Sequence, residues 1–307
     1  MPPSLTIFTA PKPFTDPHIS IIQKNAIRSW QNIGEDVDVL LIGDEEGMAE
    51  VAADLGVQHL PDVECNEIGT PLVSSIFDLA RANSIAPVLA YVNADILVMS
   101  DFVEVANLVA SQVKDYLVIG QRWDLDVDSE LDFDPGWEIR LRDKVQINGS
   151  LHPPAGSDYF IFARHLFVGM PKFAIGRAGW DNWAIYHGVS SGWSVITATE
   201  SIMIVHQNHD YGHLPGGQIH YDLEESHKNA ELGGGLSNMY TVLEANSVLV
   251  DGKVQSIGPS LTRLLRKIEL QLITEDQQGL KWSTLRRVRR LRRRLTGSSR
   301  DESLLRL

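Results

Sequence analysis

Short apolar runs alternate with helical periodicity through the first hundred residues. This pattern predicts strands at 5–10, 37–43, 57–60 and 87–98, separated by helices at 18–32, 45–56 and 70–84. In the first of these helices, apolar residues recur at the three- to four-residue spacing of one helical face. Strands that alternate with helices form a mainly parallel sheet with helices on both faces. The sequence therefore predicts an α/β fold.

Ligands of such a sheet bind beyond the carboxyl ends of its strands. This rule places three segments along one rim of the expected sheet: 9–14, Gly43 with Asp44, and Asn93 to Asp95. We expect the ligand site there. The chain up to residue 250 is less regular, with strands expected at 115–123, 158–164 and within 194–208, a helix at 180–188, and loops at 124–134 and 212–238.

Charge is unevenly distributed over the 307 residues. The chain carries 27 Lys and Arg against 40 Asp and Glu, yet residues 281–307 are strongly basic at +8, which leaves −21 for residues 1–280. An acidic body repels nucleic acid, so we expect no nucleic-acid partner. It still binds a phosphorylated substrate when a divalent cation mediates. The only cysteine, Cys65, excludes an intrachain disulfide and a cysteine-based metal site.

The basic tail has Leu or Val at 285, 288, 291 and 295, on one face of an expected helix, with Arg at most other positions. Such a helix is typical of binding to an anionic membrane surface or partner. The alternative is a solvated helix that packs its apolar stripe on the body. Neither a secretory leader nor an apolar run of membrane-spanning length is recognised. We therefore expect a cytoplasmic protein that residues 281–307 could attach to the inner face of the membrane.

Asp95 and Asp181 are the strongest candidates for chemistry. Asp95 ends the hydrophobic run of YVNADILV, where a carboxylate is costly unless solvated or paired; holding Mg or Mn against a diphosphate is one role, and an ordinary turn or cap is the other. Asp181 lies between two tryptophans in GRAGWDNW. Desolvation by these rings would raise its pKa towards the range of a general base, whereas a helix N-cap explains it equally well.

Other polar residues give weaker signals. VHQNHDYGH brings together His206, His209, Asp210 and His213, which could ligate a metal or bind phosphate but match no zinc signature. Ser157 and Asp158 could bind substrate hydroxyls or simply begin a strand. Arg122 could contact a phosphate or form a surface salt bridge. The chain lacks a G-x-G-x-x-G after its first strand, which argues against a Rossmann dinucleotide site, and it contains neither a P-loop nor a G-x-S-x-G nucleophile elbow.

Taken together, these segments resemble the GT-A glycosyltransferases of the nucleotide-diphospho-sugar transferase superfamily. The resemblance covers residues 5–250, is greatest to a poorly characterised bacterial and plant group, and is carried by TIFTAPKPF, NEIGTPLVSSIFDLA, YVNADILV, GQRWDLD, HPPAGSDYF, AIGRAGWDNW and HQNHDY. It implies a Rossmann-like GT-A fold. Residues 1–98 would be the nucleotide-sugar-binding half, 99–250 the acceptor-binding half, and 251–307 a helical extension with the basic tail.

The resemblance also implies roles for individual residues. The family binds its metal through the last Asp of a D-x-D motif, and the triplet here is Asn93-Ala94-Asp95. Asp95 would bind Mn or Mg with His206, whereas Asn93 would contact ribose without adding charge. Asp181 would be the general base. Further donor contacts would come from Thr9, Ala10, Pro11, Lys12, Phe14, Asp44 and Arg122, and acceptor or sugar contacts from Trp123, Ser157, Asp158, Trp180 and Asn182.

The implied activity is metal-dependent transfer of a sugar from a nucleotide diphosphate to a hydroxyl of a sugar or glycan acceptor, with inversion. Three alternatives stay open: a retaining transferase, a nucleotidyltransferase, and a catalytically inactive nucleotide-sugar-binding scaffold. The lack of a G-G-x-G-T-R-like loop argues against the nucleotidyltransferase. Asn93, in place of an Asp, is the feature that favours the inactive scaffold.

Overall fold

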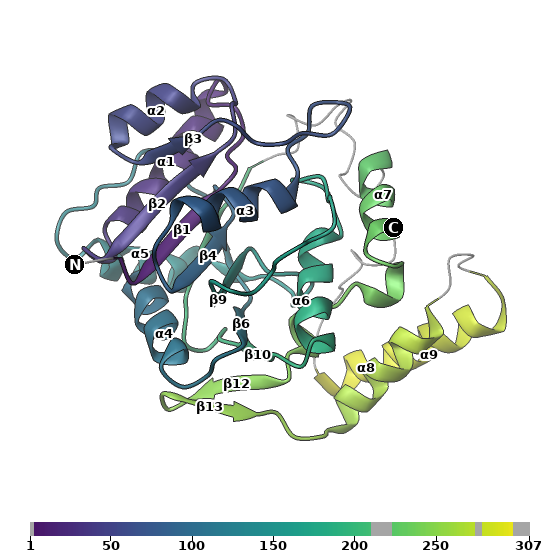
Figure 1. Ribbon diagram of the computed structural model, residues 1–307. Helices are drawn as coiled ribbons and strands as arrows, with labels where there is room; N and C mark the ends of the chain where they lie inside the picture. Colours follow the sequence, from purple (N-terminus) through teal and green to yellow (C-terminus); the bar gives the residue numbers. More distant parts are fainter. Residues whose placement is uncertain (1–2, 210–222, 274–277, 297–307) are drawn as a thin grey trace.

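The computed structural model describes residues 3–209, 223–273 and 278–296 (Figure 1). The strands are β1 (Leu5–Thr9), β2 (Val37–Ile42), β3 (Gln58–Leu60), β4 (Val88–Val92), β5 (Ile96–Leu97), β6 (Tyr116–Ile119), β7 (Trp123–Leu125), β8 (Ser150–Leu151), β9 (Tyr159–Ala163), β10 (Ser194–Thr197), β11 (Val205–Gln207), β12 (Ser247–Val250) and β13 (Lys253–Ser256). The helices are α1 (Pro17–Gln31), α2 (Met48–Leu55), α3 (Val73–Asn83), α4 (Ser100–Ala110), α5 (Trp137–Asn148), α6 (Trp180–Ser190), α7 (Glu224–Leu232), α8 (Leu261–Leu272) and α9 (Gly279–Thr296). Two short 3-10 helices, η3 (Leu236–Asn238) and η4 (Val242–Glu244), follow α7.

The central sheet has the strand order β13-β12-β10-β6-β9-β4-β1-β2-β3. β9 runs antiparallel to both its neighbours and β13 antiparallel to β12, while the other neighbouring strands are parallel. A second, smaller sheet has the order β5-β11-β7-β8. The predicted α/β fold with a mainly parallel sheet is therefore confirmed.

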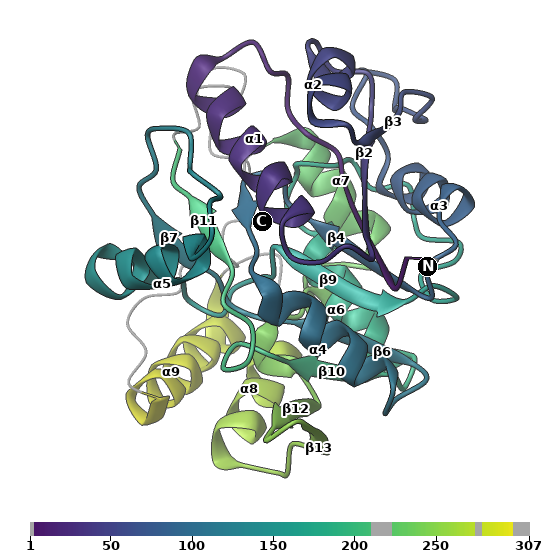
Figure 2. The same ribbon diagram turned by 90° about the vertical axis from the view of Figure 1, so that its left-hand side faces the viewer.

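Helices cover both faces of the central sheet (Figure 2). Side chains of a strand alternate between the two faces, and those of β9 identify the helices on each. Phe160 and Phe162 pack against Trp180 of α6 and Phe77 of α3. Tyr159 points the other way and meets Phe102 of α4. Thus α3 and α6 lie on one face and α4, together with α1, on the other.

Local sequence explains where the first helices begin and end. The side chain of Asp16 accepts a hydrogen bond from the backbone N–H of Ile19 at 2.9 Å, and Pro17 is the first residue of α1. Both are favourable at a helix N-terminus. Helix α2 ends at Leu55 and is capped by Gly56, which has the left-handed conformation that glycine adopts at little cost (φ 67°).

Several expected elements differ from the structure. The predicted strand 87–98 is interrupted after Asn93 by a turn, in which the N–H of Ile96 donates to Asn93 O; its second part is β5, in the smaller sheet. The predicted strand 115–123 ends at Ile119 as β6. Helices α4 and α5 were not predicted. Helix α7 lies inside the predicted loop 212–238, of which 212–222 fall outside the described residues.

At the carboxyl end of the chain, α8 and α9 pack side by side at the β12–β13 end of the sheet (Figure 1). Glu269 of α8 is fully buried and forms ion pairs with Arg266, Arg289 and Arg292 at 3.3, 3.7 and 2.7 Å. A buried carboxylate is tolerated only with such compensation. Two arginines of α9 therefore face inward.

The apolar stripe predicted for the tail does not stay on one side of α9. Leu285 is buried, but Leu291 and Leu295 are about half exposed. The alternative in which the whole stripe packs on the body is thus wrong for these two residues. In the part of the chain that the structure describes, no helix is both long and apolar enough to cross a membrane.

Candidate active site

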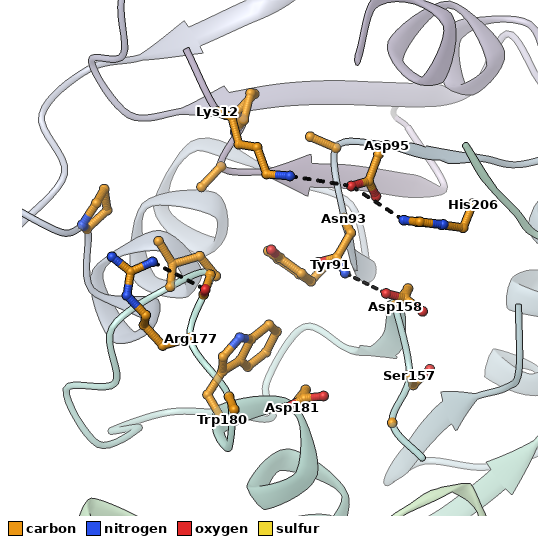
Figure 3. A pocket seen from close by; sticks show the side chains of 18 of the residues that line it. Lys12, Tyr91, Asn93, Asp95, Ser157, Asp158, Arg177, Trp180, Asp181 and His206 are labelled. Atoms are coloured by element: carbon orange, nitrogen blue, oxygen red, sulfur yellow. Dashed lines mark hydrogen bonds and ion pairs between the residues drawn. The ribbon is translucent and has the colours of Figure 1, made fainter. Parts of the chain in front are cut away.

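A cavity of about 690 Å³ opens where the carboxyl ends of β1, β2 and β4 meet (Figure 3). The loops after these strands, at the predicted rim, contribute Lys12, Gly43 and Asp95. The segment before β9 joins them because this strand is antiparallel, so its amino end lies at the same edge. The first turn of α6 forms the facing wall.

Most residues singled out from the sequence line this cavity: Ala10, Pro11, Lys12, Asn93, Asp95, Arg122, Ser157, Asp158, Trp180, Asp181, Asn182 and His206. Four others do not. Thr9 is fully buried within β1, and Phe14 packs against the hydrophobic core. Asp44 is exposed, while Trp123 pairs with Leu151 in the smaller sheet. Asp210 and His213 lie outside the described residues.

Three side chains that could bind a metal ion come together where β5 pairs with β11. In this antiparallel ladder His206 lies opposite Ile96, which brings His206 beside Asp95 although they are far apart in sequence. Oδ2 of Asp95 lies 4.0 Å from Nε2 of His206 and 3.1 Å from Nε2 of His209. One potential ligand atom from each of the three residues lies within 4.8 Å of the others.

The cluster fits a divalent metal. Oδ1 of Asp95 is buried and has no hydrogen-bond partner among the described residues, which is costly for a carboxylate oxygen. One carboxylate and two imidazoles are also a common donor set for divalent ions. Burial alone would raise the pKa of Asp95. The hydrogen bond from His209 and the charges of His206 and Lys12 outweigh it and hold that pKa far below its usual range.

Lys12 lies against this cluster. Its Nζ is 3.2 Å from Nε2 of His209 and 4.0 Å from Oδ2 of Asp95. Burial lowers the pKa of Lys12, and the nearby charge of Asp95 opposes this effect. The backbone of Lys12 is fixed by Gln23, which accepts from its N–H at 2.7 Å and donates to its carbonyl at 2.9 Å.

The carboxylate of Asp124 contacts His206 of the metal cluster and two other side chains. Its carboxylate lies 3.3 Å from Nδ1 of His206, 2.8 Å from Nδ1 of His152 and 2.9 Å from Nε of Arg122. Burial would raise the pKa of Asp124, but these partners keep it well below the usual range. A carboxylate behind a ligating histidine fixes the orientation of the ring. Asp124 is therefore placed to orient His206.

Asn93 and Arg122 share one partner. Nδ2 of Asn93 and Nη1 of Arg122 donate to Oδ1 of Asp158 at 2.8 and 2.9 Å. Burial would lower the pKa of Arg122, but Asp158, Asp124 and Asp95 raise it overall. The guanidinium thus stays charged while spanning two carboxylates.

Asp181 lies in the first turn of α6, and the N-cap residue of that helix is Gly179. The N-cap explanation of Asp181 is therefore wrong. Burial is the main cause that raises the pKa of Asp181 to about 6; the charge of Asp158 adds to it, and backbone hydrogen bonds oppose it. Gly156 leaves room for the carboxylate, because a Cβ there would lie 2.6 Å from Oδ2 of Asp181.

Tyr91 and Trp180 form an aromatic wall between Asp95 and Asp181 (Figure 3). Their rings meet edge to face with centroids 4.9 Å apart. Tyr91 was not predicted as a site residue. The two-residue alternation of a strand places it on the same side as Asn93, and this signal could have found it. His209 was noticed in its histidine cluster but was not predicted as a ligand.

Arg177 was also missed. It lines the cavity beyond Trp180, and its Nε donates to Glu225 of α7 at 2.6 Å. Glu225 in turn accepts from Asn66 at 2.7 Å. These bonds tie α7 to two loops of the cavity wall. No pattern in the sequence indicated this cluster.

Comparison with known proteins gives similarity only to solved structures, since no family model and no curated protein matches the chain. A mannosyltransferase from Pyrobaculum calidifontis, in complex with GDP-Man and Mn²⁺, aligns with 97% of this chain and 77% of its own at 11% identity and a TM-score of 0.47. Glucosyl-3-phosphoglycerate synthase from Mycobacterium tuberculosis, in complex with Mn²⁺, UDP and glucosyl-3-phosphoglycerate, aligns with 84% of this chain and 88% of its own at 14% identity and a TM-score of 0.45. A mycobacterial protein aligns over 77% and 75% at 15% identity and a TM-score of 0.44. With TM-scores below 0.5, these similarities assign no residue role and no substrate to this chain.

Proposed function

We propose that this protein is a metal-dependent GT-A glycosyltransferase that moves a sugar from a nucleotide diphosphate to a hydroxyl of a sugar or glycan acceptor, with inversion. One observation carries the proposal. A single cavity holds a cluster suited to a divalent metal, formed by Asp95, His206 and His209, and a separate carboxyl, Asp181, whose pKa is raised to about 6. A divalent metal in this cluster would stabilise a diphosphate leaving group, and a carboxyl with the raised pKa of Asp181 suits the role of a general base.

In the proposed reaction, Asp181 accepts the proton of the acceptor hydroxyl while that oxygen forms a bond to the anomeric carbon. The bond from this carbon to the diphosphate oxygen breaks, and the nucleoside diphosphate leaves with the electron pair. A general base contributes about 10²–10⁴-fold to such a step. A divalent metal held by Asp95, His206 and His209 would supply positive charge for the leaving diphosphate. Trp180 and Tyr91 line the cavity between the metal cluster and Asp181, with little of either ring exposed.

The ligand set favours Mn²⁺ over Mg²⁺. Mg²⁺ is bound almost entirely by oxygen, whereas two of the three side chains here are imidazoles. We also extend the proposal to the division of the chain, with residues 1–98 as the donor half, 99–250 as the acceptor half and 251–307 as the extension. His206 and His209 come from the second half, so the two halves share the metal site.

A panel of nucleotide sugars tests the function. We expect one nucleoside diphosphate sugar to release its nucleoside diphosphate when Mn²⁺ is present, and EDTA to stop this release. Asp181→Asn should bind the same nucleotide sugar but should form free nucleoside diphosphate from it far more slowly than the wild type does. Asp143→Asn, on the exposed side of α5, is the matched control and should behave as wild type.

Other outcomes identify the alternatives. Nucleotide binding without release by the wild type would favour the inactive scaffold, and pyrophosphate release from a nucleoside triphosphate and a sugar phosphate would favour a nucleotidyltransferase. The anomeric configuration of the product, read by NMR, distinguishes inversion from retention. No binding of any nucleotide would overturn the proposal.

The tail carries a separate part of the proposal, attachment of a cytoplasmic enzyme to an anionic membrane surface. Besides the arginines around Glu269, α9 has exposed basic side chains at Lys281, Arg286, Arg287, Arg290 and Arg294, with Leu291 and Leu295 about half exposed. A basic residue near an anionic surface contributes about 1 kcal/mol. Nucleic acid, the other polyanion, would not use the exposed leucines.

Vesicle flotation tests this attachment. The full chain should float with vesicles rich in phosphatidylglycerol and not with phosphatidylcholine alone. Replacing Arg286, Arg287, Arg290 and Arg294 by Gln should abolish flotation while the ion pairs of Glu269 persist. The control replaces the exposed Lys114, Lys144 and Lys253 by Gln. Equal flotation of both variants would refute a role for α9.

A further inference from the structure

Lys12 contacts the same two atoms that would bond a metal. Its Nζ lies 3.2 Å from Nε2 of His209 and 4.0 Å from Oδ2 of Asp95, and these two atoms are themselves 3.1 Å apart. A metal ligand must direct a lone pair at the metal. An ammonium group and a divalent cation therefore compete for one pair of ligand atoms.

The charge of the site points to the same competition. Only 15% of the Asp95 side chain is exposed, so its carboxylate needs a cation nearby in the free protein. Lys12 supplies that charge. When a divalent ion takes this place, the ammonium becomes a surplus positive charge beside a second one, and the two repel each other.

The ammonium group of Lys12 can move away from Asp95 and His209, and the cavity gives it space to do so. The backbone of Lys12 is held by two hydrogen bonds with the buried side chain of Gln23, so its loop stays in place. The long side chain is about one-third exposed and lies in the wall of the large cavity. Rotation about its own bonds moves Nζ into the cavity, where a diphosphate would offer negative charge.

We propose that Lys12 is the resident cation of the metal site in the free protein, and that it yields this place to a divalent metal when a nucleoside diphosphate binds in the cavity. Lys12 then contacts the diphosphate, and metal and nucleotide each increase the affinity of the protein for the other. This inference rests on the proposed function only for the identity of the anion. The competition between Lys12 and the metal does not depend on any transfer reaction.

Calorimetric titration with Mn²⁺, with and without nucleoside diphosphate, tests the proposal. In the wild type we expect the nucleotide to tighten Mn²⁺ binding by about 100-fold, near the upper end of coupling between two sites. Lys12→Met removes the charge and keeps a long side chain. It should bind Mn²⁺ alone about tenfold more tightly than wild type, and the nucleotide should then tighten Mn²⁺ binding by only about tenfold.

Two further variants complete the experiment. Lys114→Met removes one positive charge from an exposed position and should leave both affinities at wild-type values. If Lys12→Met does not fold, as judged by circular dichroism, Lys12→Gln replaces it. The coupling measured in the wild type is a readout that needs no variant at all.

The outcomes separate this inference from the proposed function. If the wild type binds Mn²⁺ equally well with and without nucleotide, or if Lys12→Met binds Mn²⁺ alone no more tightly, the inference is overturned while the glycosyltransferase proposal stands. If neither protein binds Mn²⁺ under any condition, both are overturned. Tighter Mn²⁺ binding by Lys12→Met supports the competition even when no sugar transfer is detected.

Discussion

Replacing Asp181 by Asn should raise stability and lower activity, because both effects have one cause. Burial raises the pKa of Asp181 from its ordinary value of 3.8 to about 6. A change of about two units makes ionisation in the folded protein cost about 3 kcal/mol more than in the unfolded chain. Because the folded pKa is the higher one, the stability linked to protonated Asp181 is fully present below pH 3.8 and is lost as the pH rises through about 6.

At pH 8 the wild type carries this whole cost and Asp181→Asn carries none. The variant should therefore have a free energy of unfolding up to about 3 kcal/mol higher at pH 8. Below the ordinary pKa of 3.8 the carboxyl is protonated in both states, and the gain should vanish. Urea unfolding at several pH values measures the difference, with exposed Asp143→Asn as the control that should show none.

Activity should respond in the opposite direction. Wild-type kcat/KM should rise with pH through about 6 and level off above it, because only the ionised carboxylate accepts the proton. Asp181→Asn should lose about 10²–10⁴-fold in kcat and lose this pH dependence. A variant that keeps activity within tenfold of wild type, or one that is destabilised at pH 8, would refute the reasoning.

The other predictions concern three positions. Asp95→Asn should abolish the Mn²⁺-dependent rise in melting temperature that a nucleoside diphosphate causes, since it removes the carboxylate that the described part of the chain contributes to the metal cluster; an unchanged rise would contradict that assignment. Gly156→Ala should lower kcat at least about tenfold with little change in the melting temperature, because its Cβ would meet only the movable end of Asp181. Glu269→Gln should destabilise the α8–α9 pair by about 3–5 kcal/mol, measured by urea unfolding and limited proteolysis, because Arg289 and Arg292 lose the buried carboxylate of Glu269, while Arg266 keeps its ion pair with Glu244. Wild-type resistance to protease would show that α9 is held by other contacts.

The fold class followed from the sequence because it depends on local pattern. Apolar runs and helical spacing fix which segments become strands and helices, and their alternation fixes the parallel sheet. The rim followed too, so Lys12 and Asp95 were predicted to lie near one ligand. The predicted strand bounds were wrong where tertiary contacts determine the path of the chain. Residues 96 and 97 continue an apolar run, yet they leave the central sheet because a turn from Asn93 to Ile96 redirects the chain and β5 then pairs with β11.

Residues that act through distant partners could not be predicted from local sequence pattern, and the pairing of His206 with Asp95 was expected from the family resemblance alone. His206 reaches Asp95 only through the pairing of β5 with β11, and nothing local to either segment specifies that pairing. Asp124 was one acid among many in an acidic loop until the structure placed His152 and His206 on it. Glu269 is similar, since its burial depends on arginines that lie on another helix.

Asn93 shows how such a network changes the meaning of a motif. Compared with the D-x-D motif, Asn93 stands where the motif has its first Asp, so the triplet has one carboxylate fewer. In the structure its Nδ2 donates to Asp158, so an Asp at 93 would face the charge of Asp158 and lose that bond. Asp158 in turn is neutralised by Arg122. Among the described residues, the metal cluster is thus left with Asp95 as its only carboxylate, and Lys12 already balances that charge. A site built this way should hold a metal weakly on its own and firmly with a diphosphate, which adds the negative charge that position 93 does not.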